Sequence, residues 1–534
     1  MQESQTVPCG INKFHRKPVQ DVDTYCSVHC LNSDNGSIRT HSSGQISEPY
    51  LTLESSSTNG CQLVSNSPST VSFSPSGSPV SPNDSQSHPD PCLSQENAPC
   101  SPLKKSCVSE DVNHKLQELE SLMHAPDPDT LGIYEKSYTV GPTQVSLETD
   151  GWKEIMEMIS HGDLKEVLIA CAKAVSENDI LTTECLISEL RSMVSVSGEP
   201  IQRLGAYILE GFVARFAQSG SAIYKSLRCK EPASHDLLSY MHLLYEICPY
   251  FKFGYMSANG AIAEAMKDED RVHIIDFQIA QGTQWISLIQ ALAARPGGPP
   301  HICITGIDDS TSAHARAGGL DIVAKRLSKL AQMCNVPFKF RAVEVSASEV
   351  EFEHLGIQPG EALAVNFALM LHHMPDESVT TQNPRDRILR MVRSLSPKVV
   401  TLVEQESNTN TAPFFLRFLE TLHYYLAMFE SIDVAMSREH KDRINVEQHC
   451  LARDIVNIIA CEGAERVERH ELLGKWRLRF TMAGFKPYPL SPLVSGTIKT
   501  LLANYCMSYS LEERDEALYL GWMNKALIAS CAWQ

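Results

Sequence analysis

Hydrophobic and polar positions between residues 271 and 309 follow the pattern of two buried strands joined by a helix. The run 272–277 is continuous and rich in β-branched residues, which is typical of a strand buried on both faces. After a loop with one glycine, apolar residues recur at the spacing of one helix face, at Trp285, Leu288, Ile289 and Leu292. Prolines and glycines at 296–300 end this helix, and a second apolar run follows at 301–307. Strand, helix and strand in this order predict a βαβ unit with parallel strands.

The same alternation continues after residue 309. It predicts strands at 338–345, 361–371 and 397–406 and helices at 320–330, 385–395, 412–430 and 447–462. Later strands are expected at 476–482, 518–522 and 527–533. The order predicts an α/β fold, a doubly wound Rossmann-type sheet with a terminal antiparallel hairpin, similar to S-adenosylmethionine-dependent methyltransferases.

Residues 151–268, which precede this sheet, carry helical periodicity. Asp163 followed by Glu166 resembles a capping box and predicts the start of a helix. Apolar stripes follow, among them Leu164, Val167, Leu168, Leu186 and Leu190. We expect an N-terminal helical cap whose stripes form the core of a bundle; the alternative is a surface for a dimer or another partner.

The first 150 residues have the composition of a disordered regulatory tail. Between residues 61 and 107 serine, proline and asparagine dominate, and such a segment buries too little apolar area to offset chain entropy. Serines precede prolines at Ser67, Ser74, Ser78, Ser81 and Ser101, so the alternatives are a solvated spacer and a tail phosphorylated by proline-directed kinases. A short helical island is expected at 110–124.

Charge, hydropathy and cysteine content argue against several classes of protein. The net charge is −18, and no basic stripe of the kind that binds nucleic acid is present, so contact with DNA would need a local patch or a partner. The N-terminus lacks the apolar core of a signal peptide, and no run is long enough to span a membrane. The 17 cysteines are scattered, which indicates reduced thiols. Cys26, His29 and Cys30 lack a second ligand pair, so no metal is expected.

The loop after the first strand decides whether the fold keeps a cofactor. Close approach of a backbone to a nucleotide usually needs several glycines, and this loop has Gly282 alone. Asp308, at the end of the second strand, is placed to accept ribose hydroxyls, but such a residue also caps helices. We therefore favour structural roles for Asp276 and Asp308 and expect neither a cofactor nor catalytic residues.

Other polar or aromatic residues receive structural interpretations. His273 is expected to be a hydrogen-bonded core histidine, and His372-His373 lack a nearby nucleophile. Glu404 and Glu406 suggest acid–base work, but capping of the helix after 409–413 is the simpler account. Trp476, Trp522 and Trp533 are interpreted as packing of the terminal hairpin, with exposed tryptophans at a binding hot spot as the alternative.

These residues closely resemble the plant GRAS family of transcriptional regulators over about 152–534. The VHIID motif is intact at Val272, His273, Ile274, Ile275 and Asp276, and leucine-rich regions flank it at about 161–221 and 321–353. The resemblance implies a VHIID region at 240–305, a PFYRE region at 361–456 and a SAW region at 459–534. Their landmarks are Pro413, Arg453, Trp476, Gly484, Trp522 and Trp533, and Asp454 replaces the usual glutamate.

The island and the stretch 152–168 look like the branch of phytochrome-A-signalling and chitin-inducible, gibberellin-responsive scarecrow-like proteins. The resemblance implies a nuclear regulator, often also cytoplasmic, that acts in light, hormone or elicitor signalling. It implies no enzyme activity. Its partners would be transcription factors, including zinc-finger proteins, and other GRAS proteins in homo- or heterodimers. Direct DNA binding stays open.

The competing hypothesis is a small-molecule sensor or methyltransferase-like enzyme. It would retain a pocket at the first βα loop, formed by Asp276, Gly282 and Asp308. A third hypothesis, a module that binds DNA without a partner, requires salt-dependent duplex binding by the purified protein.

Overall fold

The computed structural model describes residues 157, 159–216, 234–309 and 319–534. The tail at 1–150 and its helical island lie outside these residues and remain expectations. Before the first strand the chain forms α4 (Leu164–Glu177), α5 (Ile180–Met193), α6 (Pro200–Phe216), α8 (Ser234–Ile247) and α9 (Tyr250–Ala265). As predicted, the side chain of Asp163 caps α4 by accepting a hydrogen bond from the Glu166 amide.

Five parallel strands follow: β1 (Arg271–Asp276), β2 (His301–Ile307), β3 (Phe338–Val343), β4 (Ala362–Ala368) and β5 (Val399–Gln405). The helices between them are α10 (Thr283–Ala293), α12 (Gly319–Met333), α13 (Phe352–Leu355) and α14 (Pro384–Ser394). The predicted βαβ unit and the alternation after it are confirmed.

The last part of the sheet is antiparallel. Strands β8 (Ala517–Trp522) and β9 (Lys525–Trp533) form the predicted hairpin, and the sheet order is β3-β2-β1-β4-β5-β9-β8-β7. The order from β3 to β5 is that of a doubly wound sheet, in which successive strands are added outward from β1 on one side and then from β4 on the other. The predicted fold class is therefore confirmed.

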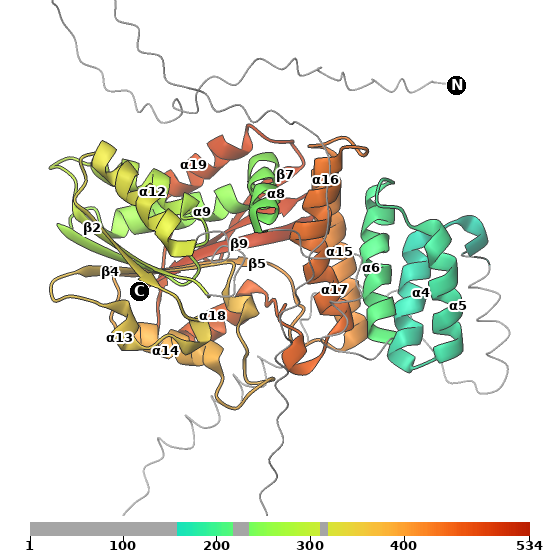
Figure 1. The fold of residues 1–534 in the computed structure, drawn as a ribbon. Coiled ribbons are helices and arrows are strands. Elements are labelled where there is room, and N and C mark those ends of the chain that lie inside the picture. Colours follow the sequence, from blue (N-terminus) through green and yellow to red (C-terminus); the bar gives the residue numbers. More distant parts are fainter. Residues whose placement is uncertain (1–156, 158, 217–233, 310–318) are drawn as a thin grey trace, which may run out of the picture. The chain divides into compact units, whose positions relative to one another are not determined.

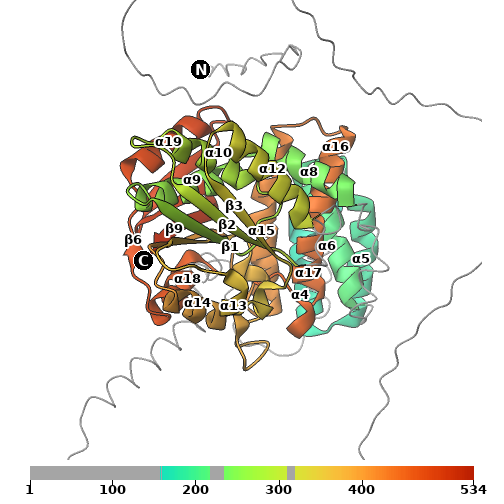
Figure 2. The same cartoon turned by 60° about the vertical axis from the view of Figure 1, so that its left-hand side comes forward.

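Helices cover both faces of the sheet, as Figure 2 shows. On one face, α9, α10 and α12 pack on apolar side chains of β1 and β2 such as Ile274 and Ile304. On the other, α13, α14 and α18 (Leu473–Met482) cover side chains such as Val365 and Leu402. Because both faces are buried, β1, β2, β4 and β5 are mostly apolar, whereas the edge strand β3 alternates apolar and charged residues and is partly exposed.

The helical cap differs from the prediction in its membership. Helices α4 and α6 pack against α15 (Phe414–Asp433), and α6 also packs against α17 (Ala452–Ala460); both partners come from the segment after β5 (Figure 1). Helix α9, expected in the cap, instead lies on β5 and β9, where Gly254 allows close approach to Val403. The stripes of α4, α5 and α6 are buried, which confirms the interpretation of these stripes as core.

The strand predicted at 476–482 is wrong, because these residues belong to helix α18. The stretch alternates polar and apolar residues, which suggests a strand. In the helix, Leu473, Trp476 and Phe480 share the buried face, and Arg479 is buried beside them by ion pairs. The alternating pattern suggested a strand because a buried arginine, Arg479, interrupts the apolar face of the helix.

Three later elements were not predicted: β6 (Pro487–Tyr488), α19 (Pro492–Leu502) and β7 (Tyr509–Arg514). Strand β7 is the edge strand beside β8, and its last residues are charged and exposed. Edge strands are often charged because this discourages pairing with other chains, so they lack the apolar pattern of inner strands.

Candidate functional site

The carboxyl end of β1 is the position where a doubly wound sheet binds ligands. The strand register places Asp276 between Gly306 of β2 and Asn366 of β4. Whether a ligand can enter depends on the side chains that surround these three residues.

The carboxylate of Asp276 is buried and accepts hydrogen bonds at both oxygens. Trp285 Nε1 donates to Oδ2 at 2.8 Å, and Asn366 Nδ2 and the Gln278 amide donate to Oδ1 at 3.2 and 3.3 Å. Burial raises the pKa of Asp276 to about 6, although these hydrogen bonds favour the ionised form. Both carboxylate oxygens are therefore already engaged by donors of the protein itself.

A chain of amide side chains continues from this carboxylate. Gln284 Oε1 accepts from Asn366 Nδ2 at 3.1 Å, and Gln284 Nε2 donates to Asn259 Oδ1 at 3.3 Å. Asn259 Nδ2 in turn donates to the Gln284 carbonyl at 2.7 Å. These contacts connect the first turn of α10 to β4 and α9.

Side chains of the chain itself fill the crevice over β1 and β2. Ile279 is only 3 % exposed, and a Cβ on Gly306 would stand 2.7 Å from its Cδ1 atom. Gly282 has a φ of 68°, and a Cβ there would stand 2.7 Å from Val323. The absence of a side chain at these two glycines therefore makes room for Ile279 and Val323. Asp308 is buried nearby, and its amide donates to the Val343 carbonyl at 3.1 Å.

A small pocket adjoins this loop. It has a volume of about 50 Å³, far below the several hundred Å³ of typical ligand pockets. Aromatic side chains of α8 and α9 line one side, and the loop 279–283 lines the other. It has room for a few water molecules and is too small for a nucleoside.

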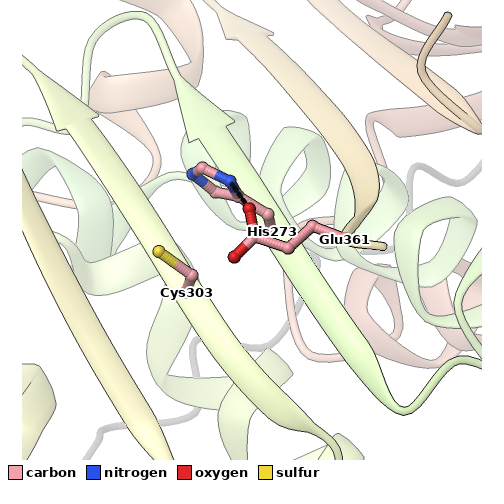
Figure 3. A group of neighbouring side chains, drawn as sticks. All are labelled: His273, Cys303 and Glu361. Atoms are coloured by element: carbon pink, nitrogen blue, oxygen red, sulfur yellow. Dashed lines mark hydrogen bonds and ion pairs between the residues drawn. The ribbon is translucent and has the colours of Figure 1, made fainter. Parts of the chain in front are cut away.

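His273 is buried in β1, as predicted, and both ring nitrogens have partners. Nδ1 lies 2.7 Å from Glu361, and Nε2 lies 2.8 Å from Thr305 Oγ1. Cys303 of β2 lies beside this pair, so three side chains of metal-binding type stand together, although both ring nitrogens are engaged by the protein (Figure 3). Burial lowers the pKa of His273, which the contact with Glu361 opposes.

The structure gives His372 and His373 partners that were not predicted. They lie in the turn after β4, beside Glu404 of β5 and beside Glu468 and His470, which precede α18. His372 Nδ1 contacts Glu404 at 2.6 Å, and His373 Nδ1 lies 3.4 Å from Glu468. The side chain of His373 is 41 % exposed; the partial loss of water around it disfavours its charged form, but Glu468 outweighs this and raises the pKa of His373 to about 9.

A buried ionic network surrounds this cluster, and sequence analysis missed it. Arg479 Nε donates to Glu471 at 2.7 Å, and Arg385 lies 3.4 Å from both Glu471 and Asp376. Burial opposes ionisation of the two carboxyls, but the arginines outweigh it and hold the pKa of each at about 2. The only sequence signal was charged residues inside apolar helix patterns.

The two carboxylates that end β5 do not cap the helix after 409–413, so that interpretation is wrong. Glu404 accepts hydrogen bonds from the amides of Met370 and Leu371 at 3.2 and 2.8 Å. Glu406 accepts from the Leu473 amide at 2.9 Å, and burial raises its pKa to about 7. Each carboxylate holds a segment distant in sequence.

The three landmark tryptophans are buried, which excludes the interpretation of an exposed hot spot. Trp522 of β8 donates from Nε1 to Glu430 of α15 at 3.2 Å, and Trp533 of β9 stacks on Phe480. Trp476 does not belong to the terminal hairpin. It lies on α18, where the guanidinium of Arg385 lies 5.0 Å from the centre of its ring.

The remaining landmarks shape the ends of helices. Pro413 precedes α15, Arg453 lies half-buried on α17, and Gly484 turns the chain after α18 with a φ of 94°. Arg393 Nε donates to the Gly484 carbonyl at 2.8 Å.

A second buried ionic group joins α6 to the segment after β5. Arg203 of α6 is fully buried and donates to Glu447 at 3.1 and 3.2 Å and to Asp433 at 2.6 Å. Arg443 also donates to Glu447. Burial raises the pKa of Glu447 to about 7, and the two arginines oppose this.

Comparison with known proteins identifies the family. A family model described as the GRAS domain family matches residues 164–534. This chain belongs to the GRAS family. The match covers the helical cap and the whole sheet, and the resemblance inferred from the VHIID and SAW motifs is confirmed.

Characterised GRAS proteins agree over most of the chain. Scarecrow-like transcription factor PAT1 of Arabidopsis thaliana is 68 % identical over 433 residues, 80 % of this chain and 88 % of that protein. Chitin-inducible gibberellin-responsive protein 2 of Oryza sativa is 62 % identical over 449 residues, which are 83 % of this chain and 82 % of that protein. The predicted branch of the family is confirmed, and the chain is a plant transcriptional regulator.

A solved GRAS structure shows the same fold. The crystal structure of SCL7 from Oryza sativa superposes with a TM-score of 0.63 at 34 % identity, and covers 70 % of this chain and 99 % of that one. In the described residues of this GRAS protein no helix is both long and apolar enough to cross a membrane.

Proposed function

We propose that this GRAS protein regulates transcription by binding other proteins and catalyses no reaction. One observation carries the proposal: the crevice where a fold of this type binds nucleotides is filled by Ile279, which packs on Gly306 of β2. The loop around Gly282 then serves the packing of α10 and α12. We assign Asp276 and Asp308 to structural roles for the same reason.

The filled crevice supports a direct test. Calorimetry of the full-length protein with S-adenosylmethionine is expected to show no binding. Measurable affinity that Asp308→Ala abolishes would refute the proposal and favour the sensor or enzyme. The pocket beside the loop 279–283 is the observation in favour of that alternative, so hydroxylated plant metabolites form a second titration series.

The partners we propose are transcription factors, zinc-finger proteins included, and other GRAS proteins. The cap offers an apolar surface for such contacts at the start of α5, where Ile180 and Leu181 are 58 % and 77 % exposed. Contiguous exposed apolar patches mark interaction sites, and we propose that these two neighbouring side chains belong to one. We place the action in the nucleus, with part of the protein in the cytoplasm, and regulation in the tail at 1–150.

Proximity labelling in plant nuclei tests this surface. The expected result is that Leu181→Asp removes partners that the wild-type protein labels. Met333→Asp on α12, another exposed apolar position, is the matched control and should keep them. Identical partner sets for the two variants would contradict the assignment of the surface to α5.

A further inference from the structure

Three segments that are distant in sequence bring histidine and carboxylate side chains together beyond the carboxyl ends of β4 and β5. The turn Leu371–His373 supplies His372 and His373, and the segment before α18 supplies Glu468 and His470. One ligand atom from each of His372, His373 and Glu468 can be chosen so that all three lie within 4.8 Å of one another.

The separations around Glu468 are those of metal ligands. His372 Nε2 and His470 Nε2 lie 3.6 and 3.7 Å from Oε2, and His373 Nδ1 lies 3.4 Å from Oε1. The first two are too long for hydrogen bonds. Two ligands of a tetrahedral zinc ion stand about 3.4 Å apart, given bonds of about 2.1 Å.

The far sides of two of the rings are held in the way that metal sites hold histidines. His372 Nδ1 contacts Glu404, whose carboxylate also accepts the Leu371 amide at 2.8 Å. His470 Nδ1 lies 2.9 Å from Thr409 Oγ1. The Glu404 carboxylate can only accept, so it holds the proton of His372 on Nδ1, and both contacts leave Nε2 directed at Glu468.

Two polar atoms in the cluster are buried without a hydrogen-bond partner: Glu468 Oε2 and His470 Nε2. Unpaired buried polar atoms are costly, and an ion bound at Glu468 Oε2 would remove this cost for the carboxylate. The side chain of His373 is 41 % exposed, so an ion can enter from solvent.

The other candidate group among the described residues lacks these properties. His273, Cys303 and Glu361 also lie together (Figure 3). Both ring nitrogens of His273 already have hydrogen-bond partners at 2.7 and 2.8 Å, Glu361 and Thr305. No ring nitrogen is left there for an ion.

We propose that His372, His373 and Glu468, with His470 beside them, bind one divalent transition-metal ion. Nitrogen and carboxylate ligands at tetrahedral spacing fit Zn²⁺, whereas Mg²⁺ and Ca²⁺ prefer oxygen ligands. The ion would join the turn after β4 to the segment before α18. Its role is to fix these segments, and no reaction is assigned to it.

Full-length protein, free of affinity histidines and stripped with a chelator, is titrated with Zn²⁺ against a competing dye. A background variant, Cys26→Ser with Cys30→Ser, removes the two closely spaced thiols beside His29, the ones in the tail that could compete for the ion. We expect the protein to bind one equivalent of Zn²⁺ with high affinity. Loss of a residue that only supports a metal ligand lowers affinity about 10–100-fold, so His373→Ala, which removes a ligand, should weaken binding at least about tenfold. His301→Ala, an exposed histidine at the start of β2, is the matched control and should bind normally.

Two further readouts separate binding from folding. Zn²⁺ should raise the melting temperature of the wild-type protein and not that of Glu468→Gln, with both melted in chelator for reference. Co²⁺ should give the visible absorption of a tetrahedral site without thiolate charge-transfer bands. No uptake, thiolate bands, or equal affinity in His373→Ala would overturn the proposal and leave only an ion pair between His373 and Glu468.

Discussion

Asp276→Asn tests the account of the first βα loop most directly. The carboxylate is buried with a pKa of about 6, whereas the carboxyl of an unfolded chain titrates at 3.8. Ionisation of the buried group therefore destabilises the fold by about 3 kcal/mol above pH 6, since one pKa unit corresponds to about 1.4 kcal/mol. This penalty disappears as the pH falls toward 4, because the folded state binds the proton more tightly than the unfolded state.

Asparagine removes the charge but keeps the shape. All three partners of the carboxylate are donors, so the new amide nitrogen faces one of them, and the buried N–H of Trp285 loses its acceptor at a cost of about 1–3 kcal/mol. Near pH 7.5 the lost penalty and the lost hydrogen bond should roughly cancel. At pH 4 the variant should be less stable than the wild-type protein by about 1–3 kcal/mol.

The assay is urea unfolding of the full chain, followed by far-ultraviolet circular dichroism between pH 4 and 7.5. The measured quantity is the difference in unfolding free energy between wild type and variant. Asp321→Asn, at an exposed position on α12, is the control for removing a carboxylate that is not buried. A difference for Asp276→Asn that is constant within about 1 kcal/mol, or that shrinks toward pH 4, would refute the reasoning. Unchanged stability with selective loss of partner binding would instead place Asp276 in an interface.

Three further predictions concern packing and reactivity. Gly306→Val should lower the unfolding free energy by about 1–3 kcal/mol, because its side chain meets Ile279, while Gly474→Ala, in open space, should not destabilise; thermal melts compare the two. Arg203→Leu should lower the unfolding free energy by about 3–5 kcal/mol, because the buried charge of Glu447 loses one of its two arginines. Adding Glu447→Leu should restore part of that free energy, and a double variant as unstable as the single one would contradict the ionic explanation. Alkylation followed by peptide mapping should modify exposed Cys506 well before the described cysteines whose thiol pKa burial raises to about 11 or 12; equal rates would contradict their burial.

The sheet was predictable because burial on both faces leaves a direct mark on sequence. The strands β1, β2, β4 and β5 are largely apolar runs between turn signals, and the alternation with helices then leaves few topologies. Periodicity does not show against which other elements a helix packs. Helix α15 has a clear stripe, but its partners are α4 and α6, more than 200 residues earlier in the chain.

The polar clusters were not predictable for a related reason. His372, Glu404 and Glu468 lie in three separate segments, and only the fold brings them together. Arg479 was misassigned to a strand because an arginine in a core position breaks the apolar stripe of its helix. By contrast, the missing glycines of the first loop were visible in the sequence, and the packing of Ile279 over β2 gives that absence a physical meaning.

The place of β9 in the sheet has a consequence for biosynthesis. This strand is made last of the nine, yet it lies in the interior of the sheet between β5 and β8. While the ribosome synthesises the residues after β5, the open edge of that strand has no neighbour and is available to other nascent chains. The nascent protein therefore needs shielding for this interval, and a nonsense mutation upstream of β9 would yield an aggregation-prone product in place of a shortened regulator.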